Sequence, residues 1–412
     1  MFNKVSVVGL GYIGLPTAAF IASKGIQVIG VDVTKHVVDT INQGKIHIVE
    51  PGLEEMVKDD VEKGLLKAYL TPQEADAFLI AVPTPFKGDN HEPNLDYIQS
   101  AATAIAKVLK SGDLVILEST SPVGATEKMA AWIAAARPEL KVSGVNADSE
   151  VDIFIAHCPE RVLPGQVIRE LEENDRVIGG LNLASTERAT ALYKTFVKGE
   201  CIATNARTAE MAKLTENASR DSQIAFANEL SMICDKQGID VWELIALANR
   251  HPRVNILQPG AGVGGHCIAV DPWFIVNQNP DEAKLINQAR LTNDFKPDWV
   301  IEKIEVAIKE VKNPVIACLG LAFKPDIDDL RESPALQITE KLAAKGYNIL
   351  AVEPNVEALP KSLIDLDNVT LVTLEEAMKQ ADAVGVLVKH KEFVSMTVAN
   401  DNVLDFVNAI IR

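Results

Sequence analysis

The sequence KVSVVGLGYIGLP, residues 4–16, decides the first fold element of this chain. Residues 5–8 form the apolar run that is typical of a buried strand, and residues 15–23 predict a helix. Gly9, Gly11 and Gly14 stand between them at GxGxxG spacing. The first glycine permits a tight turn, the second lets backbone approach a pyrophosphate, and the third lets the helix pack closely on the strand. The stretch therefore predicts a dinucleotide-binding corner.

The next apolar run indicates which dinucleotide would bind. Residues 28–31 predict a second strand, and Asp32 follows it directly. A carboxylate at this point accepts hydrogen bonds from a ribose diol and repels a 2′-phosphate. The sequence therefore favours NAD over NADP. The alternative is a plain strand–turn–helix corner that binds no nucleotide.

Alternating strand and helix patterns predict an α/β fold over the first half of the chain. The strand-like apolar runs are residues 5–8, 28–31, 78–82 and 115–117. Residues 208–236 then predict one long helix that ends at Gly238. Asp240 and Glu243 form a capping-box pattern, which predicts a further helix through Ala248.

The chain then repeats its own pattern, because strand–helix alternation resumes at residues 315–320. Residues 25–32, a glycine, an apolar strand and an acid, are matched by residues 346–353, and the Ala-Asp-Ala of 75–77 by that of 381–383. The alternative is a chance similarity between strands. We predict an α/β fold with two Rossmann-like, doubly wound parallel-sheet domains, joined by a central helical region that contains the long helix. The expected boundaries are 1–202, 203–300 and 301–412.

Composition limits the partners of the protein. Of its 412 residues, 47% are apolar and 24% are charged, which is ordinary for a globular protein. The formal net charge of -17 repels a phosphate backbone, so nucleic acid is a poor candidate partner. No apolar run reaches the roughly 18 residues of a membrane span, and the N-terminus reads as a strand and not as a signal peptide. We expect a cytoplasmic protein with no membrane partner.

A glycine-rich loop ahead of one cysteine is the strongest catalytic signal. The chain has five widely spaced cysteines without a CxxC pair, so we expect neither a disulfide framework nor a metal site. Residues 259–267, PGAGVGGHC, bring four glycines directly before Cys267. Such backbone can approach a ligand closely, and its amides can lower the pKa of a thiol. A thiolate attacks an aldehyde to give a thiohemiacetal, and hydride loss then gives a thioester that water hydrolyses.

Seven ordered motifs make the chain resemble the UDP-glucose/GDP-mannose dehydrogenase family over essentially its whole length. The motifs are residues 9–16, VPTP at 82–85, STSPVG at 119–124, CPER at 158–161, residues 210–217, residues 264–271, and Phe323-Lys324 with Arg331-Glu332-Ser333. Within the family, the chain is most similar to the bacterial branch that acts on UDP-N-acetyl-D-mannosamine. RVLPG at 161–165, NRHPRVN at 249–255 and GGHCIAVDPWF at 264–274 indicate this branch.

The resemblance implies a four-electron oxidation of a UDP-sugar to its uronate, with two NAD used per sugar. It implies that Cys267 forms the thioester, that Lys213 stabilises the oxyanion or shuttles a proton, and that Asn217 helps to position the oxygen. It also implies that Glu160 is the general base, with Thr120 and Asp271 organising the water. The implied NAD contacts are Gly9, Gly11, Tyr12, Ile13, Gly14, Asp32, Thr84, Thr126 and Arg331. The implied UDP-sugar contacts are Arg161, Val162, Lys213, Asn217, Arg220, His251, Arg253, Gly264, Phe323 and Lys324.

The resemblance also implies the roles of the three domains, which are NAD binding, a central dimerisation domain with Lys213 and the cysteine loop, and UDP-sugar binding. Arg253 would reach into a neighbouring subunit, so a homodimer or larger homo-oligomer is implied. The product would supply N-acetylmannosaminuronate for a surface polysaccharide such as enterobacterial common antigen. Pro164 departs from the glucose-type branch, which has a second acid there, and Ser219 replaces the usual aromatic residue.

Less specific explanations exist for several of these residues. The polar residues at 210–221 recur at helical spacing, which by itself is typical of a solvated stripe. Phe323 alone fits a core position, and Asp271 before Pro272 fits a helix N-cap as well as a catalytic role. His251 and Arg253 fit a surface turn, and Arg331 fits a helix-end ion pair.

Three functions compete at this point. The first is a UDP-sugar 6-dehydrogenase, for which UDP-N-acetylglucosamine and UDP-glucose are alternative substrates. The second is a two-electron NAD dehydrogenase of the hydroxyacid type, which needs no thiol and releases one NADH per substrate. The third is a nucleotide-sensing protein without catalysis. The loop that ends at Cys267 and the presence of Lys324 favour the first function.

Overall fold

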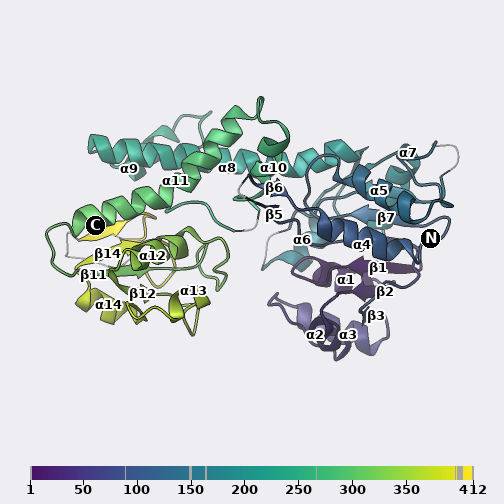
Figure 1. The fold of residues 1–412 in the computed structure, drawn as a ribbon, viewed down its shortest axis with the longest axis horizontal. Helices are drawn as coiled ribbons and strands as arrows, with labels where there is room; N and C mark the ends of the chain where they lie inside the picture. The colour runs from purple at the N-terminus through teal and green to yellow at the C-terminus, as the bar shows by residue number, and fades with distance from the viewer. Residues whose placement is uncertain are drawn as a thin grey trace. The chain divides into compact units, whose positions relative to one another are not determined.

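A computed structural model describes residues 2–88, 90–147, 151–162, 165–265, 267–394, 396 and 402–410. It divides into two compact units, Met1–Thr215 and Glu216–Arg412. Figure 1 traces the chain from one unit into the other. The sequence predicted three domains, 1–202, 203–300 and 301–412, and this division stays a prediction.

The first unit is built on a sheet of eight strands within the described residues, in the order β10-β9-β8-β7-β4-β1-β2-β3. The order from β3 to β8 is the 3-2-1-4-5-6 arrangement of a dinucleotide-binding fold. A short hairpin, β5 (Phe86–Lys87) with β6 (Glu92–Pro93), follows β4 in the chain. The strands of the sheet are β1 (Lys4–Val8), β2 (Gln27–Val31), β3 (Leu66–Tyr69), β4 (Ala77–Ile80), β7 (Leu114–Leu117), β8 (Phe154–His157), β9 (Arg176–Gly180) and β10 (Cys201–Asn205).

The predicted α/β fold with a doubly wound sheet is confirmed, although one pair of neighbouring strands in this sheet is antiparallel. β9 runs antiparallel to β8, with Ala156 opposite Gly180 and His157 opposite Gly179, and β10 is parallel to β9. An antiparallel neighbour needs no crossover back to the start of β8. Because of this reversal, Arg176 at the start of β9 lies near the end of β8, close to Glu160. The periodicity of the strands does not predict this contact.

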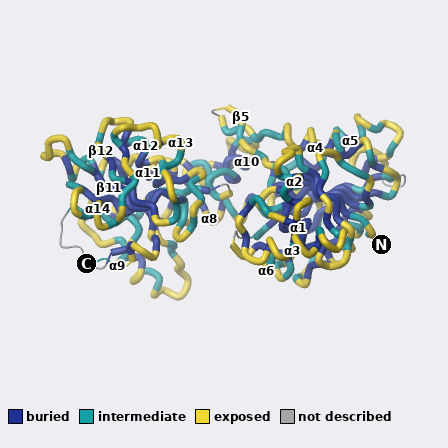
Figure 2. Tube along the Cα trace, turned by 90° about the horizontal axis from the view of Figure 1, so that it is seen from below, coloured by how far each residue is buried: buried dark blue, intermediate teal, exposed yellow. Residues whose placement is uncertain are grey.

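Helices cover both faces of this sheet, since its buried side chains form two clusters. One cluster holds Val5 and Val7 of β1 with residues of α1 (Gly14–Ser23), α2 (Lys35–Asn42), α3 (Leu53–Glu62), α6 (Val167–Glu173) and α7 (Leu183–Tyr193). The other holds Val8 with residues of α4 (Asp96–Ala106) and α5 (Ala125–Ala136). Figure 2 shows this buried interior as a dark band through the strands.

The long helix predicted at residues 208–236 is α8 (Ala206–Gln237), and Gly238 follows it with φ of 69°. The predicted cap at Asp240 is also present, because its side chain accepts hydrogen bonds from the amides of Trp242 and Glu243 at the start of α9 (Val241–Ala248). The remaining helices before the second sheet are α10 (Asp271–Gln278) and α11 (Lys284–Ala307).

The second unit contains a parallel sheet in the order β13-β12-β11-β14-β15. Residues of α11 and α12 pack on one face, with Ile316 and Cys318 of β11, while Ala317 and Leu319 face a second cluster that includes α14. The elements are β11 (Val315–Leu319), α12 (Pro334–Ala344), β12 (Asn348–Val352), α13 (Lys361–Ile364), β13 (Val369–Leu371), α14 (Leu374–Gln380), β14 (Ala383–Val386) and β15 (Val403–Asp405).

The two sheets share more than strand order. Gly9 and Gly320 both have φ above 90°, and each donates its amide over 2.8 Å to the last residue of the next strand, Val31 or Val352. Asp76 accepts from the backbone at the start of β1 as Asp382 does at the start of β11. The internal repeat predicted from sequence is therefore structural.

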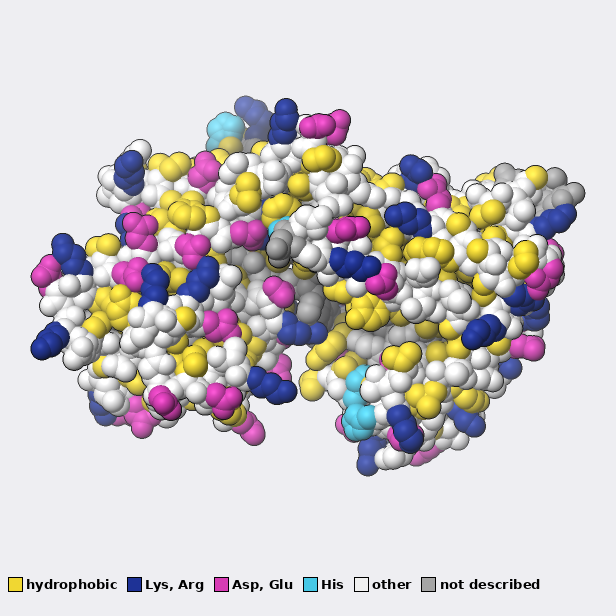
Figure 3. Space-filling model, in the orientation of Figure 1, with side chains coloured by type: hydrophobic (Ala, Val, Ile, Leu, Met, Phe, Trp, Pro, Cys, Tyr) yellow, Lys and Arg dark blue, Asp and Glu magenta, His cyan; other side chains and the backbone are white. Residues whose placement is uncertain are grey.

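Surface chemistry is mixed on the face drawn in Figure 3, where acidic and basic side chains are interspersed. Across the described residues, no helix combines the length and the apolarity that crossing a membrane requires.

Candidate active site

Steric constraints at the turn after β1 match the roles predicted for its glycines. A Cβ on Gly9 would lie 2.5 Å from the carbonyl oxygen of Ala81, and one on Gly14 would lie 1.7 Å from that of Gly9. A Cβ on Gly11 would meet no atom within 4 Å. Protein packing thus requires the outer two glycines, while the middle one faces space that a ligand can approach.

The start of α1 and the end of β2 suit a dinucleotide. Ile13 is the N-cap of α1 without a side-chain cap, and no acidic residue lies in its first turn, so its amides suit an anion. Tyr12, beside it, is exposed. Asp32 lies directly after β2, where Oδ2 accepts from the amide of Leu10 at 3.0 Å and Oδ1 from that of Thr34 at 2.8 Å. These bonds fix the carboxylate that we expect to read the ribose.

Thr84 lies shortly after the end of β4, and its hydroxyl group has no hydrogen-bond partner among the described residues. Its Oγ1 is also buried. Ser119 holds the preceding turn, because its hydroxyl accepts from the amide of Val82 at 2.9 Å and donates to the carbonyl oxygen of Val82 at 2.7 Å. The half-buried Thr120 follows Ser119. Together with the glycine cradle, the orphaned hydroxyl of Thr84 fits a bound NAD.

Thr126 has a protein partner that the sequence did not indicate. Its hydroxyl and its amide donate to Oε1 of Glu210 at 2.6 and 2.8 Å, and the amide of Gly124 donates to Oε2 at 2.7 Å. Glu210, in α8, thus caps the start of α5. The NAD contact expected of Thr126 stays a prediction, since this threonine is fully buried.

Glu160 lies in a buried cluster of ionisable groups. Its Oε2 accepts from Nη1 of Arg176 at 2.7 Å, and its Oε1 accepts from the amide of Arg161 at 2.6 Å. Glu118 lies nearby and accepts from the hydroxyl of Tyr193 at 2.5 Å, while its Oε2 has no partner among the described residues. Burial, together with the charge of Glu160, raises the pKa of Glu118 to about 7.

Sequence reasoning missed the partners in this cluster. Glu118, Arg176 and Tyr193 carry no motif signal, although Glu118 directly follows the strand predicted at residues 115–117. Arg161 and Val162, expected to contact substrate, are half-buried beside Glu160, while Leu163 and Pro164 lie outside the described residues. The one available signal was an arginine at the start of an apolar run, a residue that is rarely buried unless it is paired.

Cys267, in the second unit, is the exposed cysteine, whereas Cys158 of the first unit and Cys234 and Cys318 of the second unit are buried. Burial raises the pKa of the Cys318 thiol to about 12 and also raises those of Cys158 and Cys234. The carbonyl oxygen of Cys267 accepts from the amides of Val270 at 3.1 Å and Asp271 at 2.8 Å, which leads the loop into α10. Cys267 therefore has the exposure that a nucleophile needs. His266, before it, lies outside the described residues.

The glycines before Cys267 let backbone pack directly on the Phe323 segment. A Cβ on Gly264 would lie 2.3 Å from the carbonyl oxygen of Glu332, and one on Gly265 would lie 2.9 Å from the ring of Phe323. Gly265 also has φ of 82°, which an L side chain adopts with strain. The structure thus brings Gly264, Phe323 and the approach to Cys267 together.

A buried polar network anchors the start of this loop. The amide of Gly260 donates to Oδ1 of Asn228 at 2.9 Å, and Nδ2 of Asn228 donates to Asn293 at 2.9 Å. Asn293 donates to Oδ1 of Asp221 at 2.8 Å, and Arg290 donates to the same oxygen at 2.6 Å. These contacts connect α8 with α11, and none of them was predicted from sequence.

Asp271 lies in the first turn of α10, where Val270 is the N-cap. Its Oδ2 accepts from Nδ2 of Asn217 at 2.5 Å. The structure thus contradicts the N-cap interpretation and joins two predicted catalytic residues. Lys213 precedes Asn217 by one turn of α8 and is half-buried.

Other predicted contacts are less constrained. Lys324 is half-buried, with Nζ 5.8 Å from the ring centroid of Phe323. Arg220, His251 and Arg253 are exposed, and Nδ1 of His251 accepts from the amide of Arg253 at 3.4 Å. The guanidinium of Arg331 donates two hydrogen bonds to the carboxylate of Asp329, at 2.8 and 2.6 Å.

Comparison with known proteins adds three domain matches. Models of the NAD binding, central and UDP binding domains of the UDP-glucose/GDP-mannose dehydrogenase family match residues 3–197, 207–295 and 317–411. A UDP-N-acetyl-D-mannosamine dehydrogenase of Campylobacter jejuni is 66% identical over 407 residues, which cover 98% of this chain and 99% of that protein.

Two further relatives bear on the fold and on the sugar. The UDP-N-acetyl-mannosamine dehydrogenase of Staphylococcus aureus has a solved structure that is 40% identical, with a TM-score of 0.86 over 99% of this chain and 95% of that one. An NDP-N-acetyl-D-galactosaminuronic acid dehydrogenase of Ralstonia nicotianae is 59% identical over 393 residues, which cover 95% of this chain and 92% of that protein.

Proposed function

Because this chain belongs to the UDP-glucose/GDP-mannose dehydrogenase family, we propose that it is an NAD-dependent UDP-N-acetyl-D-mannosamine 6-dehydrogenase. The observation that carries the substrate is the 66% identity, over nearly the whole chain, to a protein with that activity. Another relative, 59% identical, is named for N-acetyl-D-galactosaminuronic acid, so an assay has to decide which N-acetylated sugar this protein oxidises. The product would be UDP-N-acetyl-D-mannosaminuronate, used for a surface polysaccharide of the enterobacterial common antigen type.

The reaction removes four electrons from the C6 alcohol and adds one water oxygen. Bound NAD supplies the hydride acceptor, and two NAD are reduced for each sugar. The alcohol becomes an aldehyde, and the Cys267 thiolate adds to its carbon to give a thiohemiacetal. Oxidation of that adduct gives a thioester, and water then displaces the thiolate and releases the carboxylate.

We assign the stabilisation of negative charge and the orientation of the substrate oxygen to polar residues of α8 and α10. Lys213 would stabilise negative charge on the substrate oxygen, and Asn217 would orient the same oxygen. Asp271 accepts from the Asn217 amide, which holds that amide in one orientation. Asp271 and Thr120 would also order the attacking water.

Glu160 would accept the proton of that water. Arg176 and the amide of Arg161 each use one lone pair of its two carboxylate oxygens. A carboxylate offers about four acceptor sites, so capacity remains for a water molecule. The contacts also fix the orientation of the carboxylate, which general-base catalysis requires.

The two nucleotide sites would use the residues expected from sequence. NAD would be held by Gly9, Gly11, Tyr12, Ile13, Gly14, Asp32, Thr84, Thr126 and Arg331. The UDP-sugar would be held by Arg161, Val162, Lys213, Asn217, Arg220, His251, Arg253, Gly264, Phe323 and Lys324. The orphaned hydroxyl of Thr84 and the open space at Gly11 support the first set, and the packing of Phe323 on the cysteine loop supports the second.

We also propose a homodimer or a larger homo-oligomer, with Arg253 reaching the neighbouring subunit. Exposed apolar side chains on the helices of the second unit support this assembly, because such residues commonly mark interfaces. They are Phe226, Ile233, Leu247, Leu291 and Phe295. The proposed compartment is the cytoplasm, where a reactive thiol stays reduced.

Product stoichiometry tests the function directly. Purified protein is offered UDP-N-acetylmannosamine, UDP-N-acetylglucosamine, UDP-glucose and GDP-mannose, and the NADH and acid formed are quantified. We expect the highest rate with the first sugar and two NADH per acid. Equal or better rates with UDP-N-acetylglucosamine would overturn the sugar, and one NADH per sugar would favour a two-electron dehydrogenase.

A further inference from the structure

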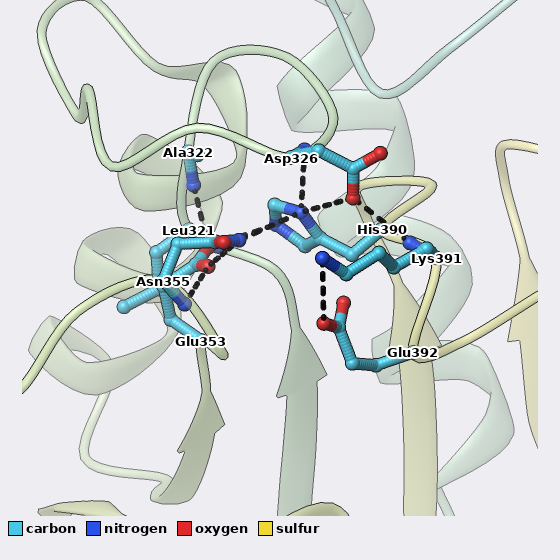
Figure 4. A network of polar contacts seen from close by, with 8 residues as sticks. All are labelled: Leu321, Ala322, Asp326, Glu353, Asn355, His390, Lys391 and Glu392. Carbon is cyan, nitrogen blue, oxygen red and sulfur yellow. Dashed lines mark hydrogen bonds and ion pairs between the residues drawn. The ribbon is translucent and has the colours of Figure 1, made fainter.

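In the second sheet, the corner that corresponds to the glycine turn of the first sheet contains a network of polar contacts between the protein's own side chains and backbone (Figure 4). Glu353, after β12, stands where Asp32 stands after β2. Its Oε2 accepts from the amides of Leu321 at 2.8 Å and Ala322 at 3.0 Å, and its Oε1 accepts from the amide of Asn355 at 3.0 Å. Asp32 takes only the amide of Leu10 from the corresponding turn. Glutamate is one methylene longer than aspartate, so Glu353 reaches the backbone amides of Leu321 and Ala322. Amides at this turn of a dinucleotide-binding sheet would otherwise be available to the phosphates of the ligand.

His390 fills the position that corresponds to Thr84. The amide of Ala81, directly after β4, donates to Val8 at the end of β1. In the same way the amide of Leu387, directly after β14, donates to Leu319 at the end of β11, and Thr84 and His390 each lie three residues further on. This is the point where strand order reverses and where ligands bind in such sheets. Thr84 has an unsatisfied hydroxyl there, whereas Nε2 of the fully buried His390 lies 3.0 Å from Oε2 of Glu353.

The hydrogen bonds around His390 define its tautomer. Nδ1 accepts from the amide of Asp326 at 2.9 Å, so it carries no proton. The proton lies on Nε2, which donates to Glu353. Among the described groups, Asn355 also faces Nδ1, at 3.2 Å, and the carboxylate of Asp326 lies 3.9 Å from it.

Together the two residues hold both ends of one loop. Glu353 binds the amides of Leu321 and Ala322, and His390 binds the amide of Asp326. Phe323 and Lys324 lie between these anchors. Asp326 has φ of 60°, and its Oδ1 accepts from the amide of Lys391 at 3.0 Å, so the loop is also joined to the segment that carries His390.

We propose that Glu353 and His390 are positioning residues, which occupy the crevice equivalent to the expected dinucleotide site of the first sheet and thereby hold Phe323 and Lys324 in the conformation that binds the nucleoside diphosphate of the substrate. The inference rests on the proposed function, since it takes Phe323 and Lys324 as contacts of that group. Glu353 keeps its charge in this setting. Burial alone would raise its pKa, but hydrogen bonds from His390 and from backbone amides lower it to about 2.

Three variants and one ligand test the proposal. His390→Leu removes the donor to Glu353 and the acceptor for Asp326, while His390→Gln restores one donor and one acceptor. Thr339→Val is the matched control, because Thr339 is buried in the same unit and its hydroxyl donates to the carbonyl oxygen of Ala335 at 2.9 Å, away from the loop. The probe is UDP, whose affinity is measured by calorimetry at a temperature where all variants are folded.

We expect His390→Leu to weaken UDP binding and raise the KM for the UDP-sugar by about tenfold or more, the loss typical of a displaced charge-assisted contact. The kcat at saturation and the KM for NAD stay within about twofold, since no group that touches the reacting atoms has changed. His390→Gln recovers most of the UDP affinity. Thr339→Val lowers the melting temperature but leaves UDP affinity unchanged.

Two results would overturn the proposal. One is wild-type UDP affinity in His390→Leu, and the other is an equal loss of affinity in Thr339→Val, which would show a general effect of destabilisation. UDP binding needs no turnover, so this outcome is separate from that of the sugar assay. Wild-type protein that binds UDP but oxidises no UDP-sugar would contradict only the proposed function.

Discussion

Arg176 and Glu160 form a buried ion pair, with Nη1 of the arginine 2.7 Å from Oε2 of the glutamate. A buried pair of this kind often adds little net stability, because both charges lose their hydration. Its effect here is geometric, since it fixes the carboxylate that we assign as general base. Removing one partner would leave the other charge buried and uncompensated.

Glu160→Gln should separate the two halves of the reaction. The amide cannot accept the proton of the attacking water, so we expect thioester hydrolysis to slow by about 10²-fold while the thioester still forms. Intact-mass spectrometry of quenched reactions should show a sugar adduct accumulating on Cys267. Glu139→Gln, an exposed change in the same unit, is the control. Loss of activity without an adduct would contradict the hydrolytic role.

Cys267→Ser should abolish acid production. A serine hydroxyl is far less nucleophilic than a thiolate at neutral pH, so we expect the rate of NADH formation to fall by more than about 10³-fold. Cys201→Ser, a half-buried cysteine in the first unit, should behave as wild type. If Cys267→Ser still produced two NADH per molecule of acid at the wild-type rate, the covalent mechanism would be wrong.

Asp32→Ser should weaken the preference for NAD. Without the carboxylate, the ribose diol loses its acceptor and a 2′-phosphate meets no repulsion. We expect the KM for NAD to rise about tenfold, while that for NADP falls. Asp39→Ser, an exposed change on α2, controls for loss of surface charge. An unaltered NAD-to-NADP ratio of kcat/KM would show that Asp32 does not read the ribose.

Glu118→Gln should change how stability depends on pH. The pKa of Glu118 is raised from 4.5 to about 7, first by burial and then by the charge of Glu160. Between these values the folded state binds a proton that the unfolded state has lost, so this group stabilises the fold below about pH 4.5 and its contribution disappears as pH rises through 7. The loss is about 3 kcal/mol.

Urea unfolding at several pH values measures this effect. The stability of wild type relative to Glu118→Gln should decrease steadily from pH 4.5 to pH 8, because glutamine does not titrate. A constant difference across that range would mean that Glu118 is already ionised in the folded protein.

Local sequence signals were sufficient for much of the fold. The glycine turn at residues 9–14 and the end of α8 at Gly238 were predictable because each depends on the backbone conformation of a few neighbouring residues. The match between the two sheets was also predictable, since it repeats a glycine and an acid at fixed distances from a strand.

The site was less predictable, because its contacts join distant segments. Arg176 reaches Glu160 only because β9 reverses direction, and the Thr126 hydroxyl is satisfied by Glu210, 84 residues further along the chain. Asp271 and Asn217 were each expected to be catalytic, but their contact depends on where α10 begins. Glu353 and His390 lie 37 residues apart on different strand ends, which composition and periodicity do not connect.

The packing of Gly264 and Gly265 on the Phe323 segment also limits how such an enzyme can evolve. A lineage that replaced Phe323 would disturb the backbone leading to Cys267, because Gly265 packs directly on the ring of Phe323. If Phe323 contacts the substrate as proposed, its replacement would also alter nucleotide preference. Selectivity and reactivity would then change together, and compensating substitutions would be needed in both loops at once.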